Sequence, residues 1–124
     1  MFWIGYEMDD VNALHTGRVR ELAEARELRA YLRAVGDLVR LQILRFLAQN
    51  GEMGVTELAQ TLRVSQPLLS WHLGVLKRVG LVTVRREGRL VWYALDRQTL
   101  HTFGRRLDQW LGERPYGQEE GHDV

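Results

Sequence analysis

The segment Val64–Gly80, VSQPLLSWHLGVLKRVG, predicts a short amphipathic helix with its own start and stop signals. Ser65 is a favoured N-cap, because its hydroxyl can accept a hydrogen bond from a free backbone N–H of the first turn. Pro67 falls in that first turn, where a missing N–H costs little. Gly80 suits the left-handed conformation that commonly ends a helix. The segment therefore predicts one helix with clear boundaries.

This predicted helix has one apolar and one polar face. Leu69, Leu73 and Leu76 recur at helical spacing and form the apolar stripe. The polar face carries hydrogen-bonding, stacking or cationic side chains, which are Gln66, Ser70, Trp71, Lys77 and Arg78, with His72 at its edge. A short helix with such a face suits the major groove of DNA. Taken alone, the pattern favours an ordinary amphipathic surface helix, so the surrounding sequence has to decide.

Positive charge gathers around this segment, although the whole chain of 124 residues has a net charge of only +1. Between residues 58 and 95, a single acid, Glu87, is outnumbered by basic residues, which are Arg63, Lys77, Arg78, Arg85, Arg86 and Arg89. A local positive patch of this kind is typical of phosphate binding. The chain has no cysteine, which excludes disulfides and thiolate metal sites. No apolar run is long enough to span a membrane, so a cytoplasmic protein is expected.

Two further helices are predicted ahead of this segment. Leu38–Gln49 is apolar around most of its circumference, and we expect it to be a central buried helix that Asp37 caps. Val55 is expected in a short strand, and Thr56 is expected to cap a brief helix, ELAQTLR, over residues 57–63. Two short helices joined by a tight turn predict a helix-turn-helix.

A β-hairpin is predicted after the helix, because the apolar period changes from 3.6 to two. Its strands are expected at Leu81–Arg86 and Arg89–Leu95, with Glu87 and Gly88 in the turn. The hairpin tip carries three arginines, which are Arg85, Arg86 and Arg89. Such a tip suits a phosphate backbone; the alternative is a solvated tip whose charge prevents edge pairing.

Amphipathic helices are predicted on both sides of this core, over about Arg18–Val35 and over Arg97 to about Glu113, with Asp9 and Asp10 in a loop. We expect the two helices to pack together within one subunit and across a two-fold axis. The expected dimer residues are Leu28, Tyr31, Leu32, Leu100, Phe103, Leu107, Trp110 and Leu111. Residues 1–17 are expected to be an N-terminal extension, residues 18–113 one domain, and residues 114–124 a mobile tail.

The stretch Gly36–Leu95 resembles the winged helix-turn-helix core of the ArsR/SmtB family of bacterial transcriptional repressors. The resemblance rests on GD-x-x-R-L-x-I-L (Gly36–Leu44), T-E-L-A (Thr56–Ala59), S-Q-x-x-x-S-x-H-L (Ser65–Leu73), L-x-x-x-G-L-V (Leu76–Val82) and R-R-E-G-R in the hairpin. Each motif is weak, but their order and spacing together are specific over about half the chain. The expected fold is mainly α with a small β-hairpin, a winged helix-turn-helix with N- and C-terminal dimerisation helices.

The resemblance implies a homodimeric repressor that binds an inverted repeat in double-stranded DNA and is released by an effector. Ser65, Gln66, Ser70 and His72 match the recognition helix, and Arg85, Arg86 and Arg89 match the wing. The remaining candidates for DNA contact are Lys77 and Trp71. Trp71 replaces a residue that is often Arg, Tyr or His, and it suits either a sugar or thymine contact or a shield at the core edge. His72 suits either a DNA contact or a hydrogen bond in the core.

Many members of this family sense metals, and the sequence predicts that this chain does not. Without cysteine the thiolate route is impossible. The family's ligand positions on the last helix fall on Arg97, Thr99, Trp110 and Glu113, of which only Glu113 fits. One carboxylate is not a transition-metal site. We therefore expect no metal and no cofactor.

Three alternatives accompany this interpretation. A winged helix can bind a protein instead of DNA, with the apolar N-terminal segment or the last helix as its docking surface. An enzyme is disfavoured, because no acid is placed to orient His72 beside Ser65 or Ser70 as a triad requires. Aromatic residues suit either an organic-effector pocket or plain interface core, and they are Trp3, Tyr6, Tyr31, Phe103 and Trp110.

Overall fold

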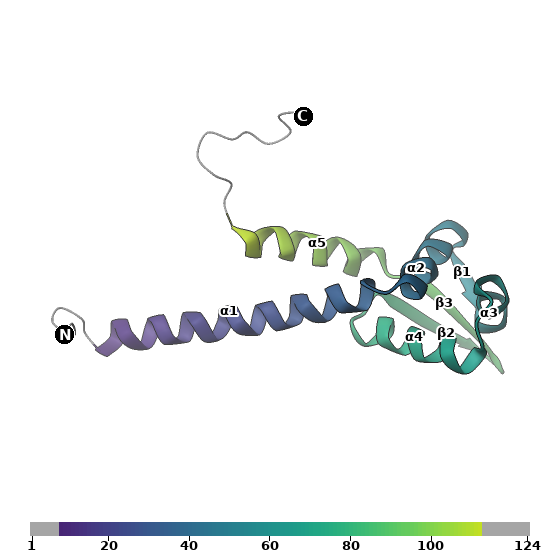
Figure 1. Cartoon of the computed structure of the whole chain (residues 1–124), viewed down its shortest axis with the longest axis horizontal. Helices are drawn as coiled ribbons and strands as arrows, with labels where there is room; N and C mark the ends of the chain where they lie inside the picture. The colour runs from purple at the N-terminus through teal and green to yellow at the C-terminus, as the bar shows by residue number, and fades with distance from the viewer. Residues whose placement is uncertain (1–7, 113–124) are drawn as a thin grey trace, which may run out of the picture.

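The computed structural model describes the backbone of residues 8–112 and the side chains of residues 16–112. The expectations for Trp3, Tyr6, Glu113 and the C-terminal tail lie outside the described residues. Figure 1 shows an elongated molecule with a winged helix-turn-helix at one end and a stalk of two helices, α1 (Met8–Val35) and α5 (Arg97–Leu111), at the other. Within the described part of the chain, no helix has the length and apolar character needed to cross a membrane.

Helix α1 begins ten residues earlier than the sequence predicted. It runs over 28 residues from Met8, so Asp9 and Asp10 lie in a helix rather than in a loop, and the expected boundary at residue 17 falls inside that helix. The sequence pattern did not predict this early start, because Gly17 interrupts it and glycine is a poor helix former with no side chain to pack. At 1.5 Å per residue, α1 is roughly 42 Å long.

Three short helices form the compact end, and they are α2 (Leu38–Asn50), α3 (Val55–Leu62) and α4 (Gln66–Arg78). Two predicted caps are confirmed: Asp37 Oδ1 accepts from Arg40 N at 3.1 Å, and Ser65 Oγ accepts from Leu68 N at 3.3 Å. The predicted cap at Thr56 is wrong. Helix α3 begins at Val55, two residues before its predicted start, and its N-cap is Gly54.

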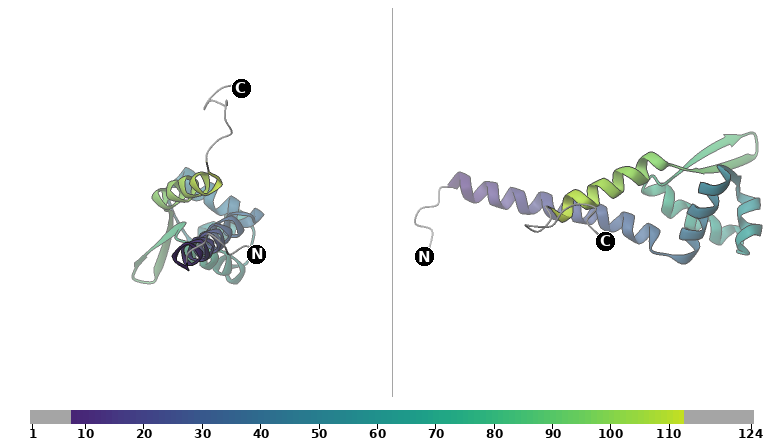
Figure 2. Two further views of the ribbon diagram at one scale, coloured as in Figure 1. Left: turned by 90° about the vertical axis from the view of Figure 1, so that its left-hand side faces the viewer. Right: turned by 90° about the horizontal axis from the view of Figure 1, so that it is seen from above.

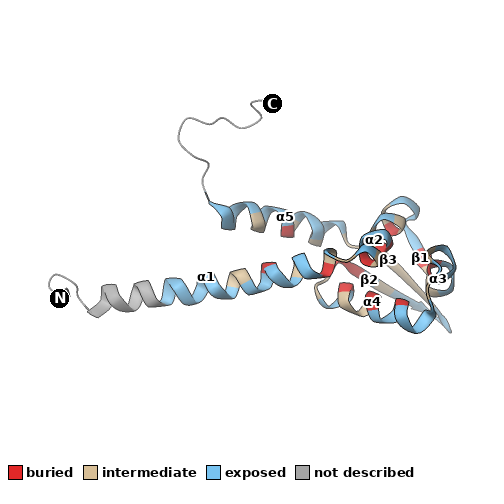
Figure 3. Cartoon of the chain, viewed as in Figure 1, coloured by how far each residue is buried: buried red, intermediate tan, exposed pale blue. Residues whose placement is uncertain are grey.

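Helix α4 is the centre of the apolar core, and its predicted stripe of Leu69, Leu73 and Leu76 is fully buried. The other largest fully buried side chains are Ile43, Leu47, Leu58 and Leu81. Figure 3 shows these buried positions gathered where α2, α3 and α4 meet the sheet. Helix α2 is not buried all round as predicted, because its outer face leaves Leu38 74% exposed and Leu41 50% exposed.

The wing belongs to a three-stranded antiparallel sheet instead of a lone hairpin. The strands β1 (Glu52–Gly54), β2 (Val82–Glu87) and β3 (Leu90–Leu95) lie in the order β1-β3-β2. Val55 is outside β1 and starts α3, so its predicted strand place is wrong by one residue. The hairpin turn is Gly88-Arg89, one residue later than predicted, since Glu87 pairs with Leu90. Gly88 has φ +61°, as its turn role requires.

The stalk forms where α5 runs back along the C-terminal half of α1, as Figures 1 and 2 show. Asp96 caps α5 as predicted, accepting from Thr99 N at 3.0 Å. The rings of Tyr31 and Phe103 stack at 5.1 Å between centroids. At the edge of this contact, Arg106 Nη2 lies 3.1 Å from a carboxylate oxygen of Glu24 and of Glu27. The predicted packing of the two helices within one subunit is therefore confirmed.

Candidate nucleic-acid interface

The outer face of α4 carries most of the predicted DNA contacts. Burial of the leucine stripe turns the opposite face outward, and there the side chains of Gln66, Ser70, Trp71, Lys77 and Arg78 are all exposed. Trp71 is 58% exposed, so it does not serve as a buried part of the core. Its ring lies over the guanidinium of Arg40, 5.6 Å from Arg40 Cζ to the ring centroid. The structure thus brings these α4 residues onto one accessible surface.

A groove of about 470 Å³ separates the first turn of α4 from the wing. Gln66 lines one side of it, and Arg89 and Trp92 line the other. Gln66 Nε2 donates to Thr56 Oγ1 at 3.2 Å, so the start of α3 orients the amide. The helix and the hairpin therefore border one continuous surface, although they are distant in sequence.

Arg85, one of the predicted phosphate contacts, is ion-paired within the wing. Its Nε and Nη2 bind both carboxylate oxygens of Glu52 at 2.9 and 2.8 Å, and its Nη1 lies 2.6 Å from Glu87 Oε2. These two carboxylates raise the pKa of Arg85 above its usual range, and the guanidinium in turn lowers the pKa of Glu52. Arg85 thus links β2 to β1, with its guanidinium over the ring of Trp92.

The other two wing arginines remain available to an external anion. Arg86 and Arg89 are exposed, and neither has an ion pair among the residues that the structure describes. Arg89 occupies the hairpin turn itself, next to Gly88. Of the three predicted wing arginines, these two are the ones without an ion pair among the described residues.

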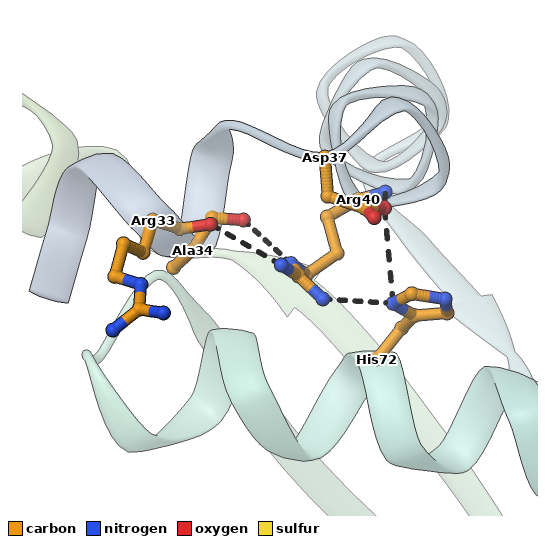
Figure 4. A network of polar contacts seen from close by, with 5 residues as sticks. All are labelled: Arg33, Ala34, Asp37, Arg40 and His72. Carbon is orange, nitrogen blue, oxygen red and sulfur yellow. Dashed lines mark hydrogen bonds and ion pairs between the residues drawn. The ribbon is translucent and has the colours of Figure 1, made fainter.

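The prediction that His72 contacts DNA is wrong, because its ring faces inward. The residue is only 5% exposed, and its Nδ1 lies 3.0 Å from Nη1 of Arg40 and 3.8 Å from Oδ1 of Asp37 (Figure 4). A buried ring cannot reach a DNA base edge. Of the two roles considered for His72, the hydrogen bond in the core is the one that the structure contains.

The predicted dimer residues divide into two groups. Leu28 and Phe103 are buried within the single chain, and Tyr31 and Leu107 are partly buried. The exposed group consists of Leu32, Leu100, Trp110 and Leu111. Tyr31 and Phe103 stack on each other within the single chain. Trp110 lines a cleft between α1 and α5.

The described side chains at the family's ligand positions on the last helix do not suit a metal ion. Arg97 Nη2 donates to the Ala48 carbonyl oxygen at 3.3 Å, and Thr99 and Trp110 are not ligands of the carboxylate or imidazole type. Glu113 lies outside the described residues. Between residues 16 and 112, no three His, Cys, Asp or Glu side chains cluster as a metal site would require.

Sequence reasoning overlooked three side chains that organise this surface, Arg40, Glu52 and Thr56. Arg40 shares one face of α2 with Ile43 and Leu47, and an arginine in such an apolar stripe is a signal that a buried polar partner exists. Glu52 and Thr56 offered no such signal, because their partners lie 33 and 10 positions away along the chain.

Comparison with known proteins agrees with this geometry. The family described as "Bacterial regulatory protein, arsR family" matches residues 37–84. A biofilm growth-associated repressor of Xylella fastidiosa is 36% identical over 89 residues, which cover 72% of this chain and 77% of that protein. The chain belongs to the ArsR family.

Other ArsR-type relatives extend the comparison. An uncharacterized HTH-type transcriptional regulator of Methanocaldococcus jannaschii is 44% identical over 61 residues, or 49% of this chain and 68% of that protein. The solved structure of HlyU from Vibrio cholerae aligns with a TM-score of 0.56 at 36% identity, covering 71% of this chain and 94% of that one. The ArsR-type chain described here is thus a DNA-binding transcriptional regulator and not an enzyme.

Proposed function

We propose that this ArsR-family regulator is a homodimeric repressor that binds an inverted repeat, with α4 in the major groove and the wing along the phosphates. The observation that carries the proposal is the groove that Gln66 of α4 and Arg89 of the wing border together. Exposed hydrogen-bonding groups suit base edges, and exposed guanidinium groups suit phosphates. The Xylella relative is named a repressor, which supports repression, whereas HlyU of Vibrio cholerae is named a transcriptional activator.

The stalk supports the dimer. In addition to Leu32 and the exposed residues of α5, two further apolar side chains of α1 are exposed, Val19 by 53% and Leu22 by 58%. Leu22 lines one cleft together with Trp110 of α5, and an exposed apolar cluster is typical of a protein-interaction surface. Two copies related by a two-fold axis would cover each other's stalk with the same patch. They would also place two α4 helices roughly 34–36 Å apart, one turn of the DNA helix.

The first experiment is fluorescence anisotropy of the full chain with DNA from upstream of its own gene, against a scrambled duplex, over a range of salt. Preferential binding with a steep negative salt slope is the expected result, because phosphate contacts release counterions. Equal affinity for the two duplexes would contradict the sequence-specific part of the proposal. Failure to bind either duplex at low salt would overturn the DNA-contacting role of α4 and the wing.

The wing assignment has its own test in the double variant Arg86→Ala, Arg89→Ala. Affinity should fall for every duplex, and the salt slope should decrease by about 3.6, or 0.9 for each of four phosphate contacts in the dimer. Arg105→Ala, which removes an exposed arginine from α5, is the matched control and should leave the slope unchanged. A double variant with the wild-type slope would exclude these arginines as phosphate contacts.

Gln66 is proposed to read base edges, so Gln66→Ala should behave differently. We expect its affinity for the preferred duplex to fall by about thirtyfold, because the dimer loses two base contacts of about 1 kcal/mol each, the lower end of the range. Its affinity for the scrambled duplex and its salt slope should not change, because no charge is removed. An equal loss on both duplexes would instead assign Gln66 a structural role through its bond to Thr56.

A further inference from the structure

The buried side chain of Arg40 connects three helices at the base of the stalk (Figure 4). Its Nε donates to the Ala34 carbonyl oxygen at 2.8 Å, and its Nη2 donates to the Arg33 carbonyl oxygen at 3.2 Å. Both carbonyls belong to the last turn of α1, where no further helical N–H can satisfy them. An arginine there also complements the negative end of the helix dipole. Arg40, on α2, thereby caps α1.

The third contact of the guanidinium reaches α4. Nη1 of Arg40 lies 3.0 Å from Nδ1 of His72. Arginine offers only donors, so Nδ1 must accept and the ring proton must be on Nε2. Among the described residues, Arg40 is the only side chain that hydrogen-bonds to both α1 and α4.

The contact between Arg40 and His72 can affect DNA binding, because it links α1 to α4. α1 belongs to the stalk that holds the two subunits together in the proposed dimer, and α4 contacts the DNA. Trp71, the neighbour of His72, packs edge-on against the imidazole at 5.0 Å and lies over the same guanidinium. A shift of Arg40 would therefore move α4 relative to the stalk without altering the outer face of α4.

We propose that Arg40 and His72 are positioning residues, a joint that fixes the angle between α1 and α4 and so sets the half-site spacing that the dimer selects. The inference rests on the proposed function, because spacing has meaning only for a dimer on an inverted repeat. One inserted base pair moves a half-site by about 3.4 Å and turns it by about 35°, so a rigid joint discriminates against it.

Two nearly isosteric variants isolate the hydrogen bond. In His72→Asn, Oδ1 is as many bonds from Cα as Nδ1 is in histidine, so it can still accept from Arg40. His72→Leu has a similar branched shape but no acceptor, so Nη1 loses its partner. We expect both variants to be folded dimers, as thermal unfolding and sedimentation would check.

The measurement is the affinity of wild type and variants for the selected inverted repeat, for the same repeat with its spacer lengthened or shortened by one base pair, and for a single half-site. In His72→Leu the ratio between the selected and shifted spacings should fall by about tenfold, close to the lower end of what a hydrogen bond to a charged group contributes. Its single half-site affinity should remain that of wild type. His72→Asn should keep the wild-type ratio.

The outcomes separate the inference from the proposed function. If wild type does not discriminate between spacings, the inverted-repeat dimer is wrong and the joint with it. If wild type discriminates and His72→Leu does so equally, or if His72→Leu loses affinity for all duplexes alike, only the joint is wrong. Should His72→Leu not fold, Arg40→Lys provides the same comparison, because one ammonium cannot span the three acceptors and a spacing ratio equal to wild type would overturn the joint.

Discussion

Asp37 lies in the short link between α1 and α2. It caps α2 through the backbone N–H of Arg40, and this bond is the main cause that lowers the pKa of Asp37 below its ordinary value of 3.8. Burial opposes this effect, and the charge of Arg40 lowers the pKa further. Because the folded pKa lies below the unfolded one, the carboxylate stabilises the fold above pH 3.8, and this stabilisation is lost as the pH falls through the folded pKa.

A comparison of wild type with Asp37→Asn isolates this effect. Asparagine retains the oxygen that accepts from Arg40 but cannot ionise, so its cap does not depend on pH. We expect the melting temperature of wild type to fall more steeply than that of the variant below about pH 4. The measurement is thermal unfolding by circular dichroism at a series of pH values. Parallel curves would show that the charge of Asp37 does not contribute.

At the scale of elements, the sequence predicted the helices whose ends are marked by local chemistry. Ser65, Asp37 and Asp96 cap the helices that they were expected to cap, because an N-cap bond spans only two or three residues. Gly80, at φ +80°, follows α4 in the left-handed conformation that was expected. The alternation of apolar residues similarly predicted β2 and β3 to within one residue.

The predictions failed where a distant part of the chain decides the outcome. The sequence did not reveal the ion pair of Arg85, because Glu52 reaches it from β1 only after the sheet has formed. His72 looked like part of a polar face until α2 brought Arg40 against it. Such long-range polar pairing leaves no periodic trace in a sequence.

The attachment of α5 to α1 depends on Phe103, which is 8% exposed and stacks on Tyr31. Phe103→Ala removes that stack, and we expect a loss of about 3 kcal/mol in the free energy of unfolding. Denaturant unfolding at fixed protein concentration measures it. Leu38→Ala is the control, because a side chain 74% exposed should cost less than about 0.5 kcal/mol. Equal effects of the two variants would mean that the α1–α5 contact contributes little stability.

At the scale of the whole molecule, the proposed dimer depends on the open stalk. Leu22 and Trp110 line one cleft between α1 and α5, and both are exposed. Trp110→Glu puts a charge into this surface, and we expect sedimentation velocity to show a monomer that has lost affinity for the inverted repeat. Leu38→Glu, on the outer face of α2, should remain a dimer. A dimeric Trp110→Glu variant would place the interface elsewhere.

Metal dependence is a second property of the whole molecule. The chain has no cysteine, and Arg97, Thr99 and Trp110 occupy the family's last-helix ligand positions. We expect neither zinc nor a chelator to change the melting temperature or the DNA affinity of dialysed protein. A melting temperature that rises with stoichiometric zinc and returns with chelator would contradict the prediction.

The length of α1 has a consequence for amide hydrogen exchange. α5 has 15 residues against 28 in α1, and every described side chain from Thr16 to Ala23 is exposed in the single chain. A helical stretch this short, without packing on either side, is marginal in water. Its amides should therefore exchange quickly in a dissociated subunit and slowly once a second copy covers them, whereas amides around Leu73 should be protected in both. The amide exchange rates of residues 16–23 then measure the fraction of chains that are in the dimer.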